Sequence, residues 1–181
     1  MPKGEKLKYH IHKSIYILNL TDMKYTWIYI LFFLMACRDN EKIKMELPDF
    51  NILLIDSSTI LNTSKIPRGK PIVLMFFSPD CEHCQAETET LLKNMDLLKN
   101  VRVYMATIDP FDRLKVFNEY YKLYNYPNIT LGRDYKFFMP IHYKINDAPY
   151  IAIYNKKKQL DTIFSGETKL NEIIEELNKL Y

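Results

Sequence analysis

The chain has 181 residues, of which 48% are hydrophobic and 26% are charged, and its formal net charge at pH 7 is +3. This length is that of about one domain with a single hydrophobic core. Residues 1–36 hold five lysines and two acidic residues, so the remaining 145 residues carry 20 basic and 20 acidic groups. Such a balance lacks the basic footprint of nucleic-acid binding, and we expect no nucleic-acid partner.

The first element in the chain is a predicted secretory signal. Lys24 supplies a positive start, and the apolar run from 27 to 36 is shorter than the ~20 residues of a membrane span. Leu34-Met35-Ala36-Cys37 resembles the bacterial lipobox, which predicts cleavage before Cys37 and acylation of its thiol. The alternative is an ordinary signal or short anchor followed by an incidental cysteine. Because residues 23–36 suffice as a lipoprotein signal peptide, residues 1–22 are either an over-called start or a long n-region.

The rest of the chain divides into a polar, lipid-anchored tether at residues 37–46 and one domain at residues 47–181. Residues 50–55 predict a strand with a turn after it, and the continuous apolar run 72–77 predicts a buried strand. A helix is predicted to begin at or beside Cys81. Its buried face is expected to hold Cys84, Thr88, Leu91, Met95 and Leu98.

The second half of the domain alternates between strands and helices. Residues 101–108 predict a strand, after which Asp109 is expected to cap a helix whose first residue is Pro110. One face of that helix is expected to hold Leu114, Phe117, Tyr121 and Tyr124. The remaining predicted elements are a short strand at 128–131, a helix near 135–143, a hairpin of strands 150–154 and 159–164, and a closing helix at 170–180.

Cys81 and Cys84 are the most informative pair of residues in the chain. Two thiols three residues apart, where a strand meets a helix, can close a short disulfide, and the positive end of the helix dipole favours the thiolate of Cys81. A structural zinc site needs two more ligands, and neither Cys37 nor the histidines offer the spacing, so we expect no bound metal. An inert structural disulfide is the other alternative to a redox-active dithiol.

Residues 70–87, which contain the apolar strand and Cys81-Glu82-His83-Cys84, resemble the active-site strand and helix of the TlpA-like thioredoxins. The resemblance covers roughly residues 47–181. It implies an α/β fold, a thioredoxin-like three-layer sandwich with a central mixed sheet flanked by helices. It also implies a thiol–disulfide oxidoreductase that needs no cofactor and lies on the periplasmic side of a membrane. The expected partners are disulfide-containing exported proteins and a membrane electron donor or acceptor, with Cys37 as the membrane anchor.

The same resemblance implies roles for individual residues. Cys81 matches the family's nucleophile and Cys84 its resolving cysteine, and the two are expected to form a disulfide. Pro149 matches the family's cis-proline, which together with Ala148 would bind an extended substrate beside that disulfide. The alternative for Pro149 is a trans-proline at the start of an edge strand, since only ~5–6% of X-Pro bonds are cis.

Two neighbours of the cysteines are predicted to tune them. Glu87 lies one helical turn beyond Cys84 and matches a glutamate of the TlpA-like reductases that serve cytochrome c maturation, where it assists proton transfer. The alternative is a solvated acid near the helix start, an interpretation that also covers Glu82. His83 would stabilise the first thiolate and favour an oxidising centre. The chain departs from thioredoxins at Met75, where they carry a buried aspartate.

Reduction of disulfides in exported proteins is the function that these features favour, and a disulfide-forming oxidase is the first alternative. A peroxiredoxin-like peroxidase would share the fold, but Leu74 stands where its motif requires proline, with Ser78 at the hydroxyl position. A thioredoxin-like copper chaperone needs one more residue between its cysteines and would have His142 as its distant histidine. A binding module that kept only the fold is the last alternative.

Overall fold

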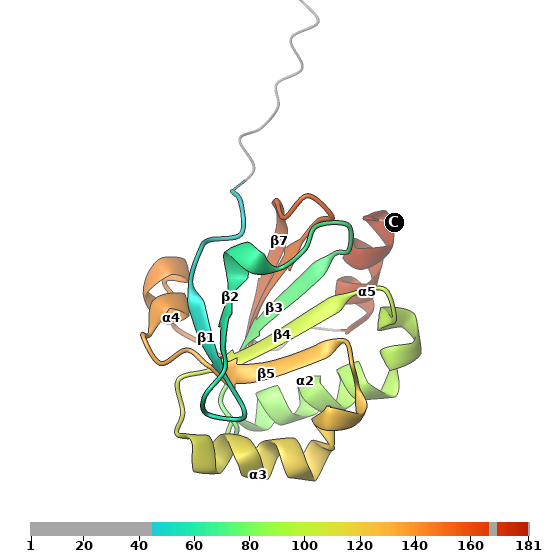
Figure 1. The fold of residues 1–181 in the computed structure, drawn as a ribbon. Helices are drawn as coiled ribbons and strands as arrows, with labels where there is room; N and C mark the ends of the chain where they lie inside the picture. Colours follow the sequence, from blue (N-terminus) through green and yellow to red (C-terminus); the bar gives the residue numbers. More distant parts are fainter. Residues whose placement is uncertain (1–44, 167–169, 181) are drawn as a thin grey trace, which may run out of the picture. The chain divides into compact units, whose positions relative to one another are not determined.

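The computed structural model describes residues 45–166 and 170–180 (Figure 1). The predicted signal, Cys37 and most of the tether lie outside these residues, so the expectations for them stay predictions. The described chain forms one seven-stranded sheet in the order β2-β1-β5-β4-β3-β6-β7. The strands are β1 (Asn51–Leu54), β2 (Ile60–Asn62), β3 (Ile72–Phe76), β4 (Arg102–Thr107), β5 (Ile129–Arg133), β6 (Tyr150–Tyr154) and β7 (Leu160–Ser165).

The centre of the sheet is the parallel trio β3, β4 and β5, and antiparallel strands continue it on both sides. β3 lies between β4 and β6, and all five of its residues are buried. A strand that is paired along both edges and covered on both faces has no place for a polar side chain, which explains the continuous apolar run.

Helices cover both faces of the sheet. The helices are α2 (Glu82–Lys93), α3 (Phe111–Tyr121), α4 (Phe138–Tyr143) and α5 (Leu170–Lys179). Side chains of α2, α3 and α5 share one apolar cluster with Val73 and Met75 of β3. Met139 of α4 belongs to a second cluster with Ile72 and Leu74, whose side chains point to the opposite face. The predicted three-layer, thioredoxin-like architecture is confirmed (Figure 1).

The predicted start of the helix after β4 is wrong by one residue. Pro110 is the N-cap of α3, and Phe111 is its first helical residue. Asp109 does not cap the helix because its carboxylate is engaged elsewhere: it accepts a hydrogen bond from Thr107 Oγ1 at 3.0 Å and pairs with Arg113 at 3.8 Å.

The ends of two other helices also differ from the prediction. α2 stops at Lys93, and the chain from Met95 to Leu98 forms a separate 3-10 turn, although Leu98 is buried as expected. α3 stops where Lys122 adopts a left-handed conformation with φ of 50°. The chain therefore turns before Tyr124, which is 59% exposed and not part of the buried helix face. The strands of the predicted hairpin and the strand near 128–131 are present as β6, β7 and β5.

Candidate active site

Cys81 lies in the connection between β3 and α2, where it serves as the N-cap of the helix. Its Sγ accepts a hydrogen bond from the backbone N–H of Cys84 at 3.3 Å. The side chain is half-buried. A cysteine in this place meets the unpaired N–H groups at the positive end of the helix, which stabilise a thiolate there.

Cys84 lies inside the protein, fully buried in the cluster that contains Met75. Burial raises the pKa of its thiol to about 12, and the nearby Cys81 and the negative charge of Asp109 contribute in the same direction. Both cysteines are free thiols in this structure. A half-buried thiol beside a fully buried one of high pKa is the asymmetry that separates an attacking from a resolving cysteine.

The peptide bond between Ala148 and Pro149 is cis, as the predicted cis-proline requires. It immediately precedes β6, whose first residue, Tyr150, pairs with Phe76 at the end of β3. This pairing brings residues far apart in the chain together: Cys81 Sγ lies 3.6 Å from the carbonyl oxygen of Ala148. The cysteine segment and the cis-proline segment, which are far apart in the sequence, therefore meet at the thiol of Cys81.

Glu87 is buried, with 5% of its surface exposed, and its Oε1 has no hydrogen-bond partner among the described residues. Burial raises the pKa of this carboxyl group to about 7. The solvated-acid interpretation is therefore wrong for Glu87, whereas Glu82 is exposed and fits it. Glu87 is thus a buried group that can gain or lose a proton near neutral pH, one helical turn along α2 from the buried thiol of Cys84.

His83 is exposed on the first turn of α2. The structure gives it no contact with either sulfur, so its predicted influence on the Cys81 thiolate stays a prediction. Met75 is fully buried, and the position of the aspartate of thioredoxins is therefore apolar here. Glu87, the acidic group that the sequence suggests for proton transfer, lies in the interior.

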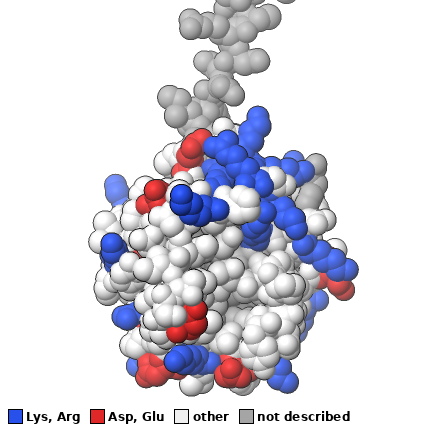
Figure 2. All heavy atoms as spheres, viewed as in Figure 1, with Lys and Arg blue, Asp and Glu red and all other residues white. Residues whose placement is uncertain are grey.

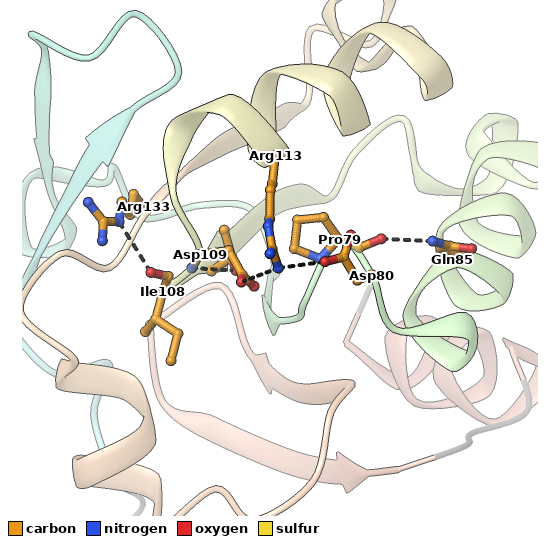
Figure 3. Close-up of polar contacts among 8 residues, drawn as sticks. Pro79, Asp80, Gln85, Ile108, Asp109, Arg113 and Arg133 are labelled. Carbon is orange, nitrogen blue, oxygen red and sulfur yellow. Dashed lines mark hydrogen bonds and ion pairs between the residues drawn. The ribbon is translucent and has the colours of Figure 1, made fainter.

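An ion-paired arginine, which the sequence analysis missed, borders the cysteine loop (Figure 3). Arg113 of α3 donates to Asp80, the residue before Cys81, at 2.6 Å, and lies 3.8 Å from Asp109. On the other side of the loop, Gln85 donates to the carbonyl oxygen of Pro79 at 2.8 Å. These contacts fix the segment that carries the first cysteine to both α2 and α3. The position of Asp80 beside a cysteine was the only available signal, since Arg113 is distant in sequence.

A groove of about 490 Å³ runs between α2 and α3 next to this network. Its lining combines loop residues such as Pro79 and Asp80 with exposed side chains of α3, among them Val116 and Tyr120. Such a surface beside a reactive thiol can contact a partner protein. Within residues 45–166 and 170–180, no cluster of three potential metal ligands occurs. In the same ranges, no helix has the length and apolar character needed to cross a bilayer.

Comparison with known proteins gives a family and a fold. The model of the AhpC/TSA family matches residues 43–155. No curated protein matches the chain. Many solved structures do, among them a secreted Mycobacterium tuberculosis disulfide oxidoreductase homologous to E. coli DsbE, with 19% identity over 72% of this chain and 96% of that one and a TM-score of 0.61.

Two further structures show the range of proteins with this fold. A peroxiredoxin-like protein from Aquifex aeolicus has 17% identity over 79% of this chain and 90% of its own, with a TM-score of 0.62. An exposed lipoprotein thioredoxin from Streptococcus pneumoniae has 21% identity over 74% of this chain and 100% of its own, with a TM-score of 0.55. At these identities the likeness establishes the thioredoxin-like fold.

Proposed function

The chain belongs to the AhpC/TSA family, and from that premise we propose that it is an extracytoplasmic, lipid-anchored thiol–disulfide oxidoreductase of the TlpA-like type that reduces disulfides of exported proteins. The observation that carries the proposal is the meeting of Cys81, Cys84 and the cis Ala148–Pro149 bond at one place. A half-buried thiol at a helix N-terminus, backed by a buried thiol and flanked by the carbonyl group of Ala148 before a cis-proline, has the parts that disulfide exchange needs.

The proposed reaction begins with the Cys81 thiolate, which attacks one sulfur of a substrate disulfide. A mixed disulfide forms, and the first substrate thiolate leaves. Cys84 then loses its proton and attacks Cys81 Sγ, so that the Cys81–Cys84 disulfide forms and the second substrate thiolate leaves. The substrate gains two electrons and the dithiol loses two, which a membrane electron donor must return. Ala148 and Pro149 would hold the substrate backbone beside the sulfur.

Glu87 supports the reductase direction. The buried thiol of Cys84, with a pKa of about 12, attacks only after it gives up a proton. A carboxyl group with a pKa of about 7 in the same interior can take that proton at neutral pH. A disulfide-forming oxidase is the alternative direction, in which exposed His83 would dominate the potential of the centre.

The reduction potential separates the two directions. A value near or below roughly −250 mV supports a reductase, and a value between about −180 and −120 mV supports an oxidase. The Cys81–Cys84 couple is titrated in glutathione or dithiothreitol buffers, and the titration requires neither a protein substrate nor the membrane electron donor.

The predicted signal and lipobox support the envelope location. A lipoprotein thioredoxin of Streptococcus pneumoniae shares the fold, which agrees with anchoring at Cys37. An acyl-modified Cys37 in the mass spectrum of the membrane-bound protein is the expected result. A free Cys37 thiol in that protein would contradict the anchor.

Peroxidase activity is a second candidate, because the family match and a peroxiredoxin-like structural neighbour favour it. The position of its motif proline is occupied by Leu74, which is buried in β3 and paired with Tyr104 and Ala152. The carbonyl oxygen of Ser78 accepts from Cys81 N–H at 3.2 Å. We expect no catalytic turnover of hydrogen peroxide by the purified protein. Sustained turnover would favour the peroxidase.

The test of the proposed function is trapping of the mixed disulfide. Cys84→Ser keeps the attacking thiol but removes the resolving one, so it should accumulate disulfide-linked exported proteins on a non-reducing gel. Cys81→Ser should accumulate none. Equal trapping by the two variants would contradict the assigned order, and trapping by neither would contradict the oxidoreductase itself.

A further inference from the structure

Basic side chains gather over one end of the domain (Figure 2). They come from three segments: the loop before β3, the start of β4 and the turn between β6 and β7. We call this surface the cationic end. Its members are Lys65, Arg68, Lys70, Lys99, Arg102, Lys156, Lys157 and Lys158.

Backbone and side-chain contacts show that the three segments lie together. The N–H of Gly69 donates to the carbonyl oxygen of Lys156 at 2.9 Å, and the N–H of Arg102 donates to that of Pro71 at 3.0 Å. Lys158 Nζ donates to the carbonyl oxygens of Thr63 and Ser64 at 3.2 and 2.9 Å. The balanced charge of the domain therefore hides a local excess, because the fold collects basic residues that are scattered along the chain.

Acidic residues offset part of this charge, among them two in exposed ion pairs. Glu46 lies 3.8 Å from Arg68, and Asp96 lies 3.0 Å from Lys99, both in exposed pairs. Such pairs are weak because water and salt screen them. Burial lowers the pKa of Lys158, and the positive charges of Arg68 and Arg102 lower it further, whereas the negative charges of Glu46 and Asp49 act in the opposite direction.

A pocket of about 350 Å³ within the cationic end is built from hydrogen-bond donors. Lys70, Lys99 and Arg102 line it together with Asn128 and Thr130, and none of its lining residues is acidic. Arg102 Nη1 is buried without a hydrogen-bond partner among the described residues. A buried guanidinium N–H that lacks an acceptor favours an anionic oxygen as its ligand.

The described chain enters the domain at the cationic end. The N–H of Leu47 donates to the carbonyl oxygen of Lys158 at 2.8 Å, and the N–H of Leu160 donates to that of Met45 at 2.7 Å. Seven residues separate Met45 from Cys37. Even a fully extended chain of that length reaches no further than about 30 Å. An acyl group on Cys37 would therefore keep this end of the domain near the lipid.

We propose that the cationic end rests on the anionic phosphate headgroups of the membrane that holds Cys37, and that it directs the cysteine loop away from the bilayer. The inference rests on the proposed lipid anchor. β3 and β4 both begin at the cationic end, and Cys81 follows the far end of β3. Basic clusters beside a membrane anchor are attracted to anionic lipid, and that attraction falls as salt rises. The anchor supplies attachment, and the cationic end supplies orientation.

The test is lysine labelling of the full, membrane-purified protein placed in vesicles. One set contains phosphatidylcholine alone, and the other contains equal parts of phosphatidylcholine and phosphatidylglycerol. Amine acylation at Lys70 and Lys157, read by peptide mass, should be about fivefold or more slower in the anionic vesicles at low salt, and the difference should vanish at high salt. Labelling of Lys115 on α3 should be the same in both sets.

Two variants control for net charge. Lys70→Gln with Lys157→Gln should remove the lipid-dependent protection of Lys65, whereas Lys115→Gln with Lys122→Gln should retain it. Equal labelling of Lys70 in both vesicle sets overturns the proposal, as does protection that includes Lys115. Protection by a nucleic-acid oligomer without protection by anionic vesicles would assign the surface to another polyanion and also overturn it.

The same sample distinguishes a failure of the proposed function from a failure of the lipid-binding proposal. The mass of the Cys37 peptide tests the anchor, and redox titration of Cys81 and Cys84 tests the oxidoreductase. If Cys37 is not acylated, mixing the protein with preformed vesicles still decides whether the cationic end binds anionic lipid.

Discussion

The two ends of the parallel strands β3 and β4 differ in how their charged and polar groups meet water. At the cysteine end, Cys84 and Glu87 are buried, and burial raises the pKa of both groups. At the cationic end, most of the basic side chains are exposed, among them Lys70 and Lys157. At the cysteine end, the exclusion of water therefore shifts the pKa values of titratable groups. At the cationic end, the exposed charges produce an electrostatic potential that extends into the solvent.

This difference predicts which measurements a substitution at each end should change. A change at the cysteine end should alter rates and pH dependence, because desolvated groups are strongly coupled to their surroundings. A change at the cationic end should alter only salt-dependent binding. The three predictions that follow change residues at the cysteine end and run from the largest expected effect to the smallest. The first also tests whether the two ends are independent.

Cys81→Ser should abolish disulfide reduction, because the only half-buried thiol of the pair is lost. The measurement is turnover of a disulfide-bonded protein substrate with dithiothreitol as the electron donor. The lysine-labelling pattern of this variant in anionic vesicles should match that of the unchanged protein. A loss of protection at Lys70 in this variant would show that the two ends are coupled.

Glu87→Gln should remove a pH dependence of stability. Folding raises the pKa of Glu87 from 4.5 to about 7, so the folded protein binds this proton more tightly than the unfolded chain. Stability is therefore highest below the unfolded pKa and falls as pH rises through about 7, by roughly 3–3.5 kcal/mol in total for this shift. The glutamine variant, which has no such proton, should lack this loss.

Urea unfolding near pH 5 and pH 8 measures the effect. Glu82→Gln is the matched control, since Glu82 is an exposed glutamate of the same helix, and it should keep the pH slope of the unchanged protein. The Glu87 variant should also slow resolution of the mixed disulfide by about tenfold to a hundredfold at neutral pH, with less effect at high pH. Equal pH slopes for both variants would mean that folding does not raise the pKa of Glu87.

The fold was predictable where the sequence pattern is strong. β3 and the β6–β7 hairpin follow from apolar runs, and α2 follows from its spacing. β2 has only three residues, none of them buried, and depends on pairing with β1 and on a hydrogen bond of 2.8 Å between Asn62 and Asn51. Tyr124 was misplaced because Lys122 adopts a left-handed conformation without a glycine to indicate it.

The candidate site divides in the same way. Cys81, Cys84, Glu87 and Pro149 follow from short-range spacing and the family resemblance, but the burial of Glu87 required the packed helix. Arg113 and the cationic end could not be predicted, because both depend on residues that only the fold brings together. A local sequence pattern indicates which functional side chains are present. The tertiary structure determines which of them are buried and which lie close to one another.

Arg113→Gln should produce the smallest of the three effects. Arg113 lies beside Asp109, whose negative charge already raises the pKa of the Cys84 thiol. Without the guanidinium, that charge acts unopposed and disfavours a thiolate, so the reduced form is less stable and the reduction potential should fall. Exposed ion pairs contribute about 0.2–1 kcal/mol, which corresponds to no more than about 20 mV for a two-electron couple.

Lys115→Gln removes the same charge from the exposed surface of α3. It should leave the reduction potential unchanged to within about a few millivolts, which is the precision of the measurement. Asp109→Asn should raise the potential, because it removes the charge that disfavours the Cys84 thiolate. Equal shifts for Arg113→Gln and Lys115→Gln would show that net charge alone tunes the centre. A shift for Arg113→Gln that Lys115→Gln does not reproduce would show that the ion pair itself does so, and that the cysteine end responds to single neighbours where the cationic end responds to the sum of its charges.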